Sequence, residues 1–270
     1  ILTGYFNIPK VFELTLNNGY DKVSKKQLGL QLGYAADFKT YDELFDAFKK
    51  QMKYFIDVKI QGSNIIEKIF ADCMPAPFLS ILTNDCIAKG KDYNAGGARY
   101  NTKYLQGVGI GTITDCLAAV KYNVYDKKNF TMDELMAALD DNFIGHERIL
   151  NLVKNHSPKY GNDDEYADEI MKQVFEYYQG EVTGRPNMLG GMYRVNMLPT
   201  TCHVYFGEVM MASANGRLAH VPVSEGISPE KGADVNGPTA VIKSCAKMDH
   251  LMTGGTLLNQ KFTPSVVAGE

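Results

Sequence analysis

The sequence lacks the features that mark several classes of protein. It contains no run of about 18 apolar residues, so no transmembrane helix and no membrane partner are expected. It carries no stripe of lysine and arginine, and its formal net charge is -3, which argues against a nucleic-acid partner. The first ten residues, ILTGYFNIPK, lack the basic segment and the apolar core of a signal peptide.

Motifs for metal binding and nucleophilic catalysis are also missing. The histidines never pair at metal-ligand spacing, no His/Cys cluster suits zinc, and no serine nucleophile elbow occurs. The cysteines are widely spaced and form no CxxC pair, which predicts buried structural thiols in a reducing compartment. These five cysteines are Cys73, Cys86, Cys116, Cys202 and Cys245. The sequence therefore predicts no metal site.

The composition is that of an ordinary globular protein. The chain has 270 residues, of which 45% are hydrophobic and 22% are charged, enough to bury a sizeable core. It opens on Ile1 rather than on methionine and ends abruptly at Ala268-Gly269-Glu270. We expect it to be a piece of a longer chain.

Helices are predicted at several places. Two capping boxes, Thr40 with Glu43 and Thr131 with Glu134, predict helix starts, and the first of these helices is expected to run towards Ile69 or Phe70. Further helical stretches are predicted over residues 112–124, 142–155 and 163–179.

Short strands and loops are predicted between these helices. Residues 202–211, CHVYFGEVMM, are typical of a buried strand, whereas residues 91–111 and 180–200 are predicted to be loops. Gly254-Gly255 is predicted to be a turn that leads into a strand over residues 256–263. Helices separated by short apolar strands indicate an α/β fold.

The glycines of Gly107-Val-Gly109-Ile-Gly111 do not match a dinucleotide fingerprint. The third glycine is out of register, because position 112 is threonine. A loop-to-helix turn with Thr112 or Thr114 as N-cap is favoured. Asn162–Glu165 lacks the ligand spacing of a calcium loop and is interpreted as a solvated helix start.

Residues 197–201, MLPTT, could line a cavity. If this segment is extended, Leu198 and Thr200 point to the same side, and they offer a small polar substrate one apolar contact and one hydroxyl. The alternative is a strand-entry segment in which Thr200 bonds to the backbone. Tyr5 is likewise either a core residue or a buried phenol aimed into a cavity.

Five long segments occur in an order and at separations that resemble a known family. They are FNIPKVFELTLNNG, GGARYNTKYLQGVGIGTITDCLAAVKYNVYD, PKYGNDDEYADEIM, GPTAVIKSCAKMDH and GGTLLNQKFTP. Together they resemble the pyruvate formate-lyase-like glycyl radical enzymes, in the dehydratase and lyase branch, over essentially the whole chain. ILTGYFNIPK and GGARYNTKYLQGVGIGT are most similar to the members that dehydrate trans-4-hydroxy-L-proline.

The resemblance implies a fold and a domain assignment. The family fold is a ten-stranded α/β barrel, and residues 1–270 would form the C-terminal part of that barrel domain, its second half. Neither the family's Gly-Cys-Val-Glu motif nor its Arg-Val-Ala-Gly-Tyr-like radical motif occurs in this sequence. We therefore expect the glycine radical domain to be absent and assign no catalytic residue to this chain.

The resemblance also implies a reaction and its partners. It implies a lyase that removes water from trans-4-hydroxy-L-proline to give 1-pyrroline-5-carboxylate, with Tyr5, Leu198 and Thr200 lining the substrate cavity. No cofactor would be bound. The glycyl radical would be installed by a radical S-adenosylmethionine activase, in an oxygen-free cytoplasm, on an enzyme that could be a homodimer.

Three alternatives stay open from the sequence. Glycerol or 1,2-diol dehydratases and choline trimethylamine-lyase share the GPTAV and TLLN segments, so they are rival assignments within the same family. A non-catalytic half-barrel that binds a partner or small ligand is the rival from another class. In either case we expect the isolated chain to be inactive and prone to association through exposed apolar surface.

Overall fold

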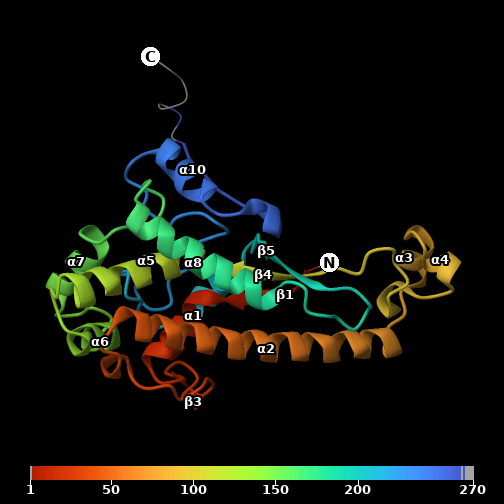
Figure 1. Ribbon diagram of the computed structural model, residues 1–270, viewed down its shortest axis with the longest axis horizontal. Helices are drawn as coiled ribbons and strands as arrows, with labels where there is room; N and C mark the ends of the chain where they lie inside the picture. Colours follow the sequence, from red (N-terminus) through yellow and green to blue (C-terminus); the bar gives the residue numbers. More distant parts are fainter. Residues whose placement is uncertain (1, 263, 265–270) are drawn as a thin grey trace.

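The computed structural model describes residues 2–262 and 264 and confirms the α/β class. Its main sheet has the strand order β1-β4-β5-β6, and all neighbouring strands are parallel. The strands are β1 (Leu2–Asn7), β4 (Lys103–Val108), β5 (Tyr193–Met197) and β6 (Thr253–Thr256). Parallel strands need long crossover connections, and helices supply them here (Figure 1).

The helices lie mainly against one face of this sheet. Phe6, Leu105 and Val195 project from that face into the main hydrophobic core. The long helices are α1 (Ile8–Leu16), α2 (Tyr41–Cys73), α5 (Ile110–Val120) and α8 (Glu165–Val182). The shorter helices are α3 (Pro77–Leu82), α4 (Cys86–Lys89), α6 (Met132–Asp140), α7 (Glu147–Asn155), α9 (Cys202–Glu208) and α10 (Pro238–Ala246).

The remaining elements are short. A short hairpin pairs the two-residue strands β2 (Tyr20–Asp21) and β3 (Lys26–Gln27). The 3-10 turns are η1 (Ala35–Asp37), η2 (Tyr93–Ala95) and η4 (His250–Met252), and a π-helical turn, η3 (Lys121–Asp126), extends α5.

The two predicted capping boxes are confirmed. The Thr40 hydroxyl accepts the Glu43 N–H at 3.2 Å, and Glu43 in turn accepts backbone N–H groups at the start of α2. Thr131 and Glu134 make the same reciprocal bonds at the start of α6. These local bonds satisfy amides that have no partner within the helix, which is why the sequence revealed both starts.

The prediction that residues 91–111 and 180–200 are loops is wrong in part, since these stretches contain β4 and β5. Both strands carry polar residues that are buried rather than solvated. The Lys103 ammonium lies 3.4 Å from the Glu67 carboxylate, and Gln106 is fully buried. The polar residues made these stretches look like loops, although both faces of each strand are covered.

The predicted strand over residues 202–211 is also wrong, because Cys202–Glu208 is helix α9. The chain leaves β5 at Met197, passes Pro199, and turns at Thr200, whose φ is +54°. This left-handed residue ends the extended run and redirects the chain before α9 begins. The β-rich composition of CHVYFGEVMM misled the prediction.

Two predictions around glycines are corrected as well. Gly254 and Gly255 lie in β6 rather than in a turn, and residues 257–262 do not continue as a strand; Thr263 lies outside the described residues. The N-cap of α5 is Gly109, with φ +84°, and not Thr112 or Thr114. A Cβ on Gly109 would lie 2.6 Å from Pro9, so glycine suits this turn sterically as well.

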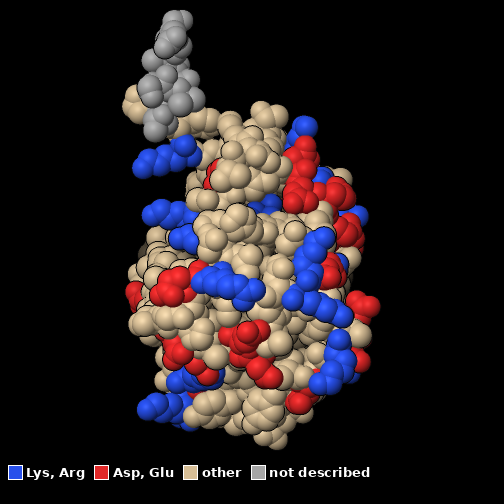
Figure 2. All heavy atoms as spheres, turned by 90° about the vertical axis from the view of Figure 1, so that its left-hand side faces the viewer, with Lys and Arg blue, Asp and Glu red and all other residues tan. Residues whose placement is uncertain are grey.

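The surface carries both signs of charge and one concentration of apolar residues. Figure 2 shows lysine, arginine, aspartate and glutamate interspersed over one face. In Figure 1, α3 and α4 project at the far end of α2, away from the sheet, and their Phe78 and Leu82 are 82% and 83% exposed. Within residues 2–262 and 264, no helix is both long and apolar enough to cross a membrane.

Candidate functional site

The face of the sheet opposite the main core carries a row of polar side chains. Tyr5 on β1 pairs in register with Gln106 on β4, and Gln106 pairs with Asn196 on β5. Register partners in a parallel sheet point to the same face, and side chains alternate along each strand. Leu198, two residues after Asn196, continues this row beyond the end of β5. Of the three predicted site residues, Tyr5 thus lies on this face, and Leu198 and Thr200 follow the end of β5.

Tyr5 lies at the edge of a small apolar cluster on this face. The cluster comprises Val108, Met210 and Val223, and Tyr5 and Phe206 pack against it. Tyr5 is half-buried. The phenol is therefore supported by apolar neighbours without being enclosed in the main core.

Leu198 and Thr200 lie on a turn that two side chains hold. The Leu198 N–H donates to Gln106 Oε1 at 3.0 Å, and His203 Nδ1 lies 3.1 Å from the Thr200 carbonyl oxygen. The Thr200 hydroxyl donates to the Pro199 carbonyl at 2.7 Å. Because Thr200 has φ +54°, the segment is not extended, and the premise that alternation places Leu198 and Thr200 on one side is wrong.

A surface hollow lies beside this turn. It has a volume of about 450 Å³ and is lined by His203 from α9 and by residues of the loop between Val221 and Lys231, with Asn259. Val223 belongs both to this hollow and to the cluster beneath Tyr5. Polar and ionisable groups, including Glu225 and Glu230, face a space large enough for a small ligand.

A buried polar network fixes that loop to α5. The Thr112 hydroxyl donates to the Glu230 carboxylate and accepts the Ser224 N–H at 2.7 Å. Asp115, fully buried, accepts the Tyr160 N–H at 2.9 Å. Burial raises the pKa of Asp115 to about 7 and also raises the pKa of Glu230. The loop therefore rests on ionisable groups that have little contact with water.

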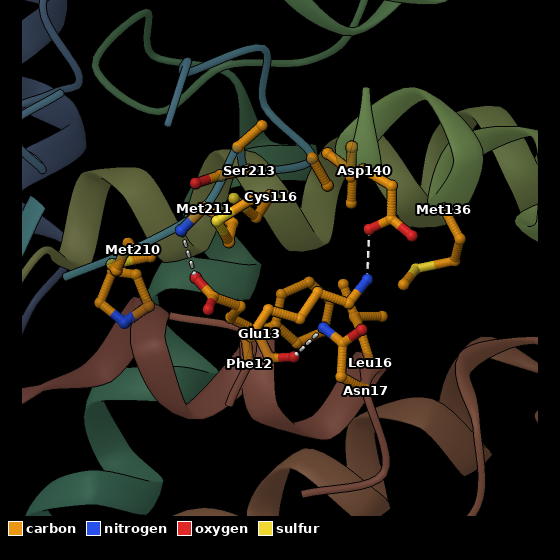
Figure 3. Close-up of a pocket in the computed structure, with 15 residues that line it drawn as sticks. Phe12, Glu13, Leu16, Asn17, Cys116, Met136, Asp140, Met210, Met211 and Ser213 are labelled. Carbon is orange, nitrogen blue, oxygen red and sulfur yellow. Dashed lines mark hydrogen bonds and ion pairs between the residues drawn. The ribbon is translucent and has the colours of Figure 1, made fainter. Parts of the chain in front are cut away.

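A separate small cavity lies among α1, α5, α6 and the segment from Met210 to Ala214 (Figure 3). Its volume is about 20 Å³, enough for about one water molecule. The Met211 N–H donates to Glu13 Oε2 at 3.0 Å, and burial raises the pKa of Glu13. Its lining does not include Tyr5, Leu198 or Thr200, so this cavity is distinct from the predicted site.

The prediction of buried cysteines is confirmed for three of the five. All five are free thiols, and Cys86, Cys116 and Cys245 are buried, whereas Cys73 is exposed and Cys202 is partly buried. Burial raises the pKa of Cys116 to about 12, which disfavours the reactive thiolate. Within the described part of the chain, no group of three or more His, Cys, Asp or Glu side chains could hold a metal ion.

Comparison with protein-family models identifies the fold family. The model described as pyruvate formate lyase-like matches residues 1–207, and the model described as glycine radical matches residues 223–270. This chain belongs to the pyruvate formate lyase-like family. The second match covers a stretch that we expected to belong wholly to the barrel, while the barrel model itself ends at residue 207.

Curated and solved relatives agree with this assignment. The chain is 68% identical over 270 residues to trans-4-hydroxy-L-proline dehydratase of Clostridioides difficile, and 36% identical to (2S)-3-sulfopropanediol dehydratase of Klebsiella oxytoca. These matches cover 100% and 98% of this chain but only 34% and 33% of the relatives. The chain thus spans about a third of the length of the curated relatives that it matches.

Solved structures match the fold closely. The hydroxyproline dehydratase from Clostridioides difficile, solved with trans-4-hydroxy-L-proline bound, superposes with a TM-score of 0.97 and covers 100% of this chain. The B12-independent glycerol dehydratase from Clostridium butyricum, solved with glycerol bound, gives 0.93 at 40% identity and covers 98% of this chain. This chain covers 34% of each of those structures and corresponds to part of their barrel.

One residue of the site was missed from the sequence. Gln106 lies between Tyr5 and Asn196 on the polar face and accepts the Leu198 N–H. The available signal was a lone amide among apolar residues in YLQGVGI, but the segment was interpreted as loop. Only the pairing of β4 with β1 and β5 places Gln106 beneath the site.

Proposed function

We propose that this chain is part of a glycyl radical dehydratase that removes water from trans-4-hydroxy-L-proline to give 1-pyrroline-5-carboxylate. The observation that carries the proposal is the 68% identity, over every residue of the chain, with a curated trans-4-hydroxy-L-proline dehydratase. The other curated and solved relatives named above are far less similar, at 36% and 40% identity.

In this proposal Tyr5, Leu198 and Thr200 line the substrate cavity. Tyr5 would pack against or hydrogen-bond the proline ring, Leu198 would shape the pocket, and Thr200 would contact the polar part of the substrate. The position of Tyr5 on the polar sheet face, with Leu198 and Thr200 just after β5, supports this assignment. A radical supplied from outside these 270 residues would start the reaction by hydrogen abstraction.

The chain's own contribution to catalysis is to hold substrate and exclude water. Radicals react indiscriminately, so a rigid and dry site is needed to keep the substrate in a productive pose. The apolar cluster beneath Tyr5 and the bonded turn at Leu198 suit that role. The acid and base that move protons would come from outside this chain.

The wider setting follows from the same proposal. We infer a radical S-adenosylmethionine activase as partner, no bound cofactor and an anaerobic cytoplasmic location, with a homodimer as the assembly. We further propose that residues 1–270 contribute the C-terminal part of the barrel domain and that the radical-bearing glycine lies outside them. The glycine radical match at residues 223–270 supports a junction between the barrel domain and the glycine radical domain within this stretch.

The decisive test is substrate turnover by the full-length enzyme that carries this chain, activated anaerobically. We expect dehydration of trans-4-hydroxy-L-proline and little or no turnover of glycerol, 1,2-propanediol or choline. Turnover of only the acyclic substrates would reject the proposal in favour of a diol dehydratase or choline lyase. Binding of a ligand without turnover of any of them would favour the non-catalytic half-barrel.

A further inference from the structure

Thr200 adopts a backbone conformation that is costly for its residue type. Its φ is +54°, in the left-handed region that β-branched residues rarely occupy. Such strain persists only where the surroundings hold the residue in place. Identifying the groups that hold this turn therefore identifies residues on which the proposed site depends.

Two side chains hold the turn from its two ends. Gln106 Oε1 accepts the Leu198 N–H at 3.0 Å, two residues before Thr200. His203 Nδ1 lies 3.1 Å from the Thr200 carbonyl oxygen. Gln106 is the more rigid of the two anchors, because it is fully buried on a central strand, whereas His203 is only partly buried on the short helix α9.

The surroundings of Gln106 fix which of its amide atoms faces the turn. The Leu198 N–H needs an acceptor, so the amide must present Oε1 to it and Nε2 elsewhere. Within the described part of the chain, Gln106 Nε2 and Asn196 Oδ1 are both buried without a hydrogen-bond partner. They are a donor and an acceptor on register-paired residues of β4 and β5. A hydrogen bond between them would satisfy both groups and hold Gln106 in this orientation.

We propose that Gln106 is a positioning residue that holds the Leu198–Thr200 turn in its substrate-binding conformation, acting through the Leu198 N–H. The inference deepens the proposed function and rests on it for the identity of the substrate. Gln106 itself is fully buried. Its effect on binding passes through the positions of Leu198 and Thr200.

The test is calorimetric titration of trans-4-hydroxy-L-proline into the full-length, unactivated enzyme and its variants. Gln106→Met keeps the side-chain length but removes the acceptor, and we expect it to weaken binding about 10-fold. Equal affinity of wild type and Gln106→Met would overturn the inference.

A double-mutant cycle separates positioning from general destabilisation. Glycine adopts a positive φ without strain, so a Thr200→Gly background has less need of an anchor. We expect Gln106→Met to cost clearly less affinity in that background than in the wild type. The same loss in both backgrounds would argue against positioning of the strained turn.

A crystal structure of full-length Gln106→Met keeps the inference testable if the proposed substrate is wrong. We expect residue 200 to leave the left-handed region in that variant. Retention of the wild-type φ would refute the positioning role. Absence of hydroxyproline binding by the wild type would instead refute the proposed function, so the two failures are distinguishable.

Discussion

Asp115 shows how one buried residue can couple stability to pH. Its carboxyl group faces Lys159, whose ammonium is 4.0 Å away, together with the Tyr160 amide and, further off, Glu230 and Asp168. Burial outweighs the lysine and raises the pKa of Asp115 to about 7, above the value of about 3.9 expected in an unfolded chain. The folded state therefore binds this proton more tightly than the unfolded state does.

The sign of the pH effect follows from that difference. The stabilising contribution of Asp115 is fully present below about pH 4 and is lost as the pH rises through about 7. Asp115→Asn cannot ionise and can still accept the Tyr160 N–H. The unfolding free energy of the variant minus that of wild type is therefore expected to increase by on the order of 1–3 kcal/mol when the pH is raised from 5 to 8.

Urea unfolding at both pH values measures this gain. Asp234→Asn, at an exposed position of the loop, serves as the control and is expected to follow the wild type. An Asp115→Asn variant with an unchanged pH dependence would show that Asp115 ionises normally in the folded protein.

At the scale of one element, β6 depends on a glycine that the sequence suggested was part of a turn. A Cβ on Gly254 would lie 2.1 Å from the Tyr104 ring and 2.4 Å from Asn196 Oδ1, whereas a Cβ on Gly255 would meet nothing within 4 Å. We expect Gly254→Ala to lower the unfolding free energy by about 1–3 kcal/mol, because the ring must move. Gly255→Ala, in the same strand, should be nearly neutral. Equal effects of the two substitutions on the urea midpoint would contradict the close packing of Gly254 against Tyr104.

Helices were more predictable from the sequence than strands, for a physical reason. The starts of α2 and α6 are determined by residues close together in sequence, because a capping box joins positions three apart. The strands β4 and β5 depend on partners far away in sequence, and their polar residues are buried by those partners. No local pattern in residues 91–111 or 180–200 carries that information.

The candidate site was likewise only partly predictable from the sequence. Tyr5, Leu198 and Thr200 were predicted, chiefly through resemblance to a family. The reasoning from side-chain alternation that supported Leu198 and Thr200 does not hold, because Thr200 is left-handed. Gln106 could not be identified without the pairing of strands. Sequence therefore indicated which residues face the substrate in the proposal, but not what holds them.

For the whole molecule, the exposed apolar residues at the end of α2 predict association of the 270-residue chain. Phe78 and Leu82 on α3 are 82% and 83% exposed, and Ile65, Ile66 and Ile69 on α2 are more than half exposed. Apolar surface on this scale marks an interface or an aggregation hazard. We expect light scattering to detect concentration-dependent oligomers of the chain.

The double variant Phe78→Ser/Leu82→Ser tests the source of that association. Both side chains are almost fully exposed, so we expect the variant to associate less while keeping its melting temperature within a few degrees. Val235→Ser is the control, because Val235 is also highly exposed but lies far from α3 in the sequence. A clean monomer at high concentration in the wild type would contradict the prediction.

The strand order has a consequence for how the chain folds. Tyr5 pairs with Gln106, Gln106 with Asn196, and Val195 with Thr253, so each step of the sheet joins segments separated by dozens of residues. The entropy lost in closing such long loops must be overcome before the strand contacts stabilise the chain, and this slows folding. On the ribosome, the pairing of β1 with β4 cannot form until β4 has been synthesised. Each strand of this sheet must wait for a distant partner, so chaperones that shield unpaired strand edges should matter while this stretch is being synthesised.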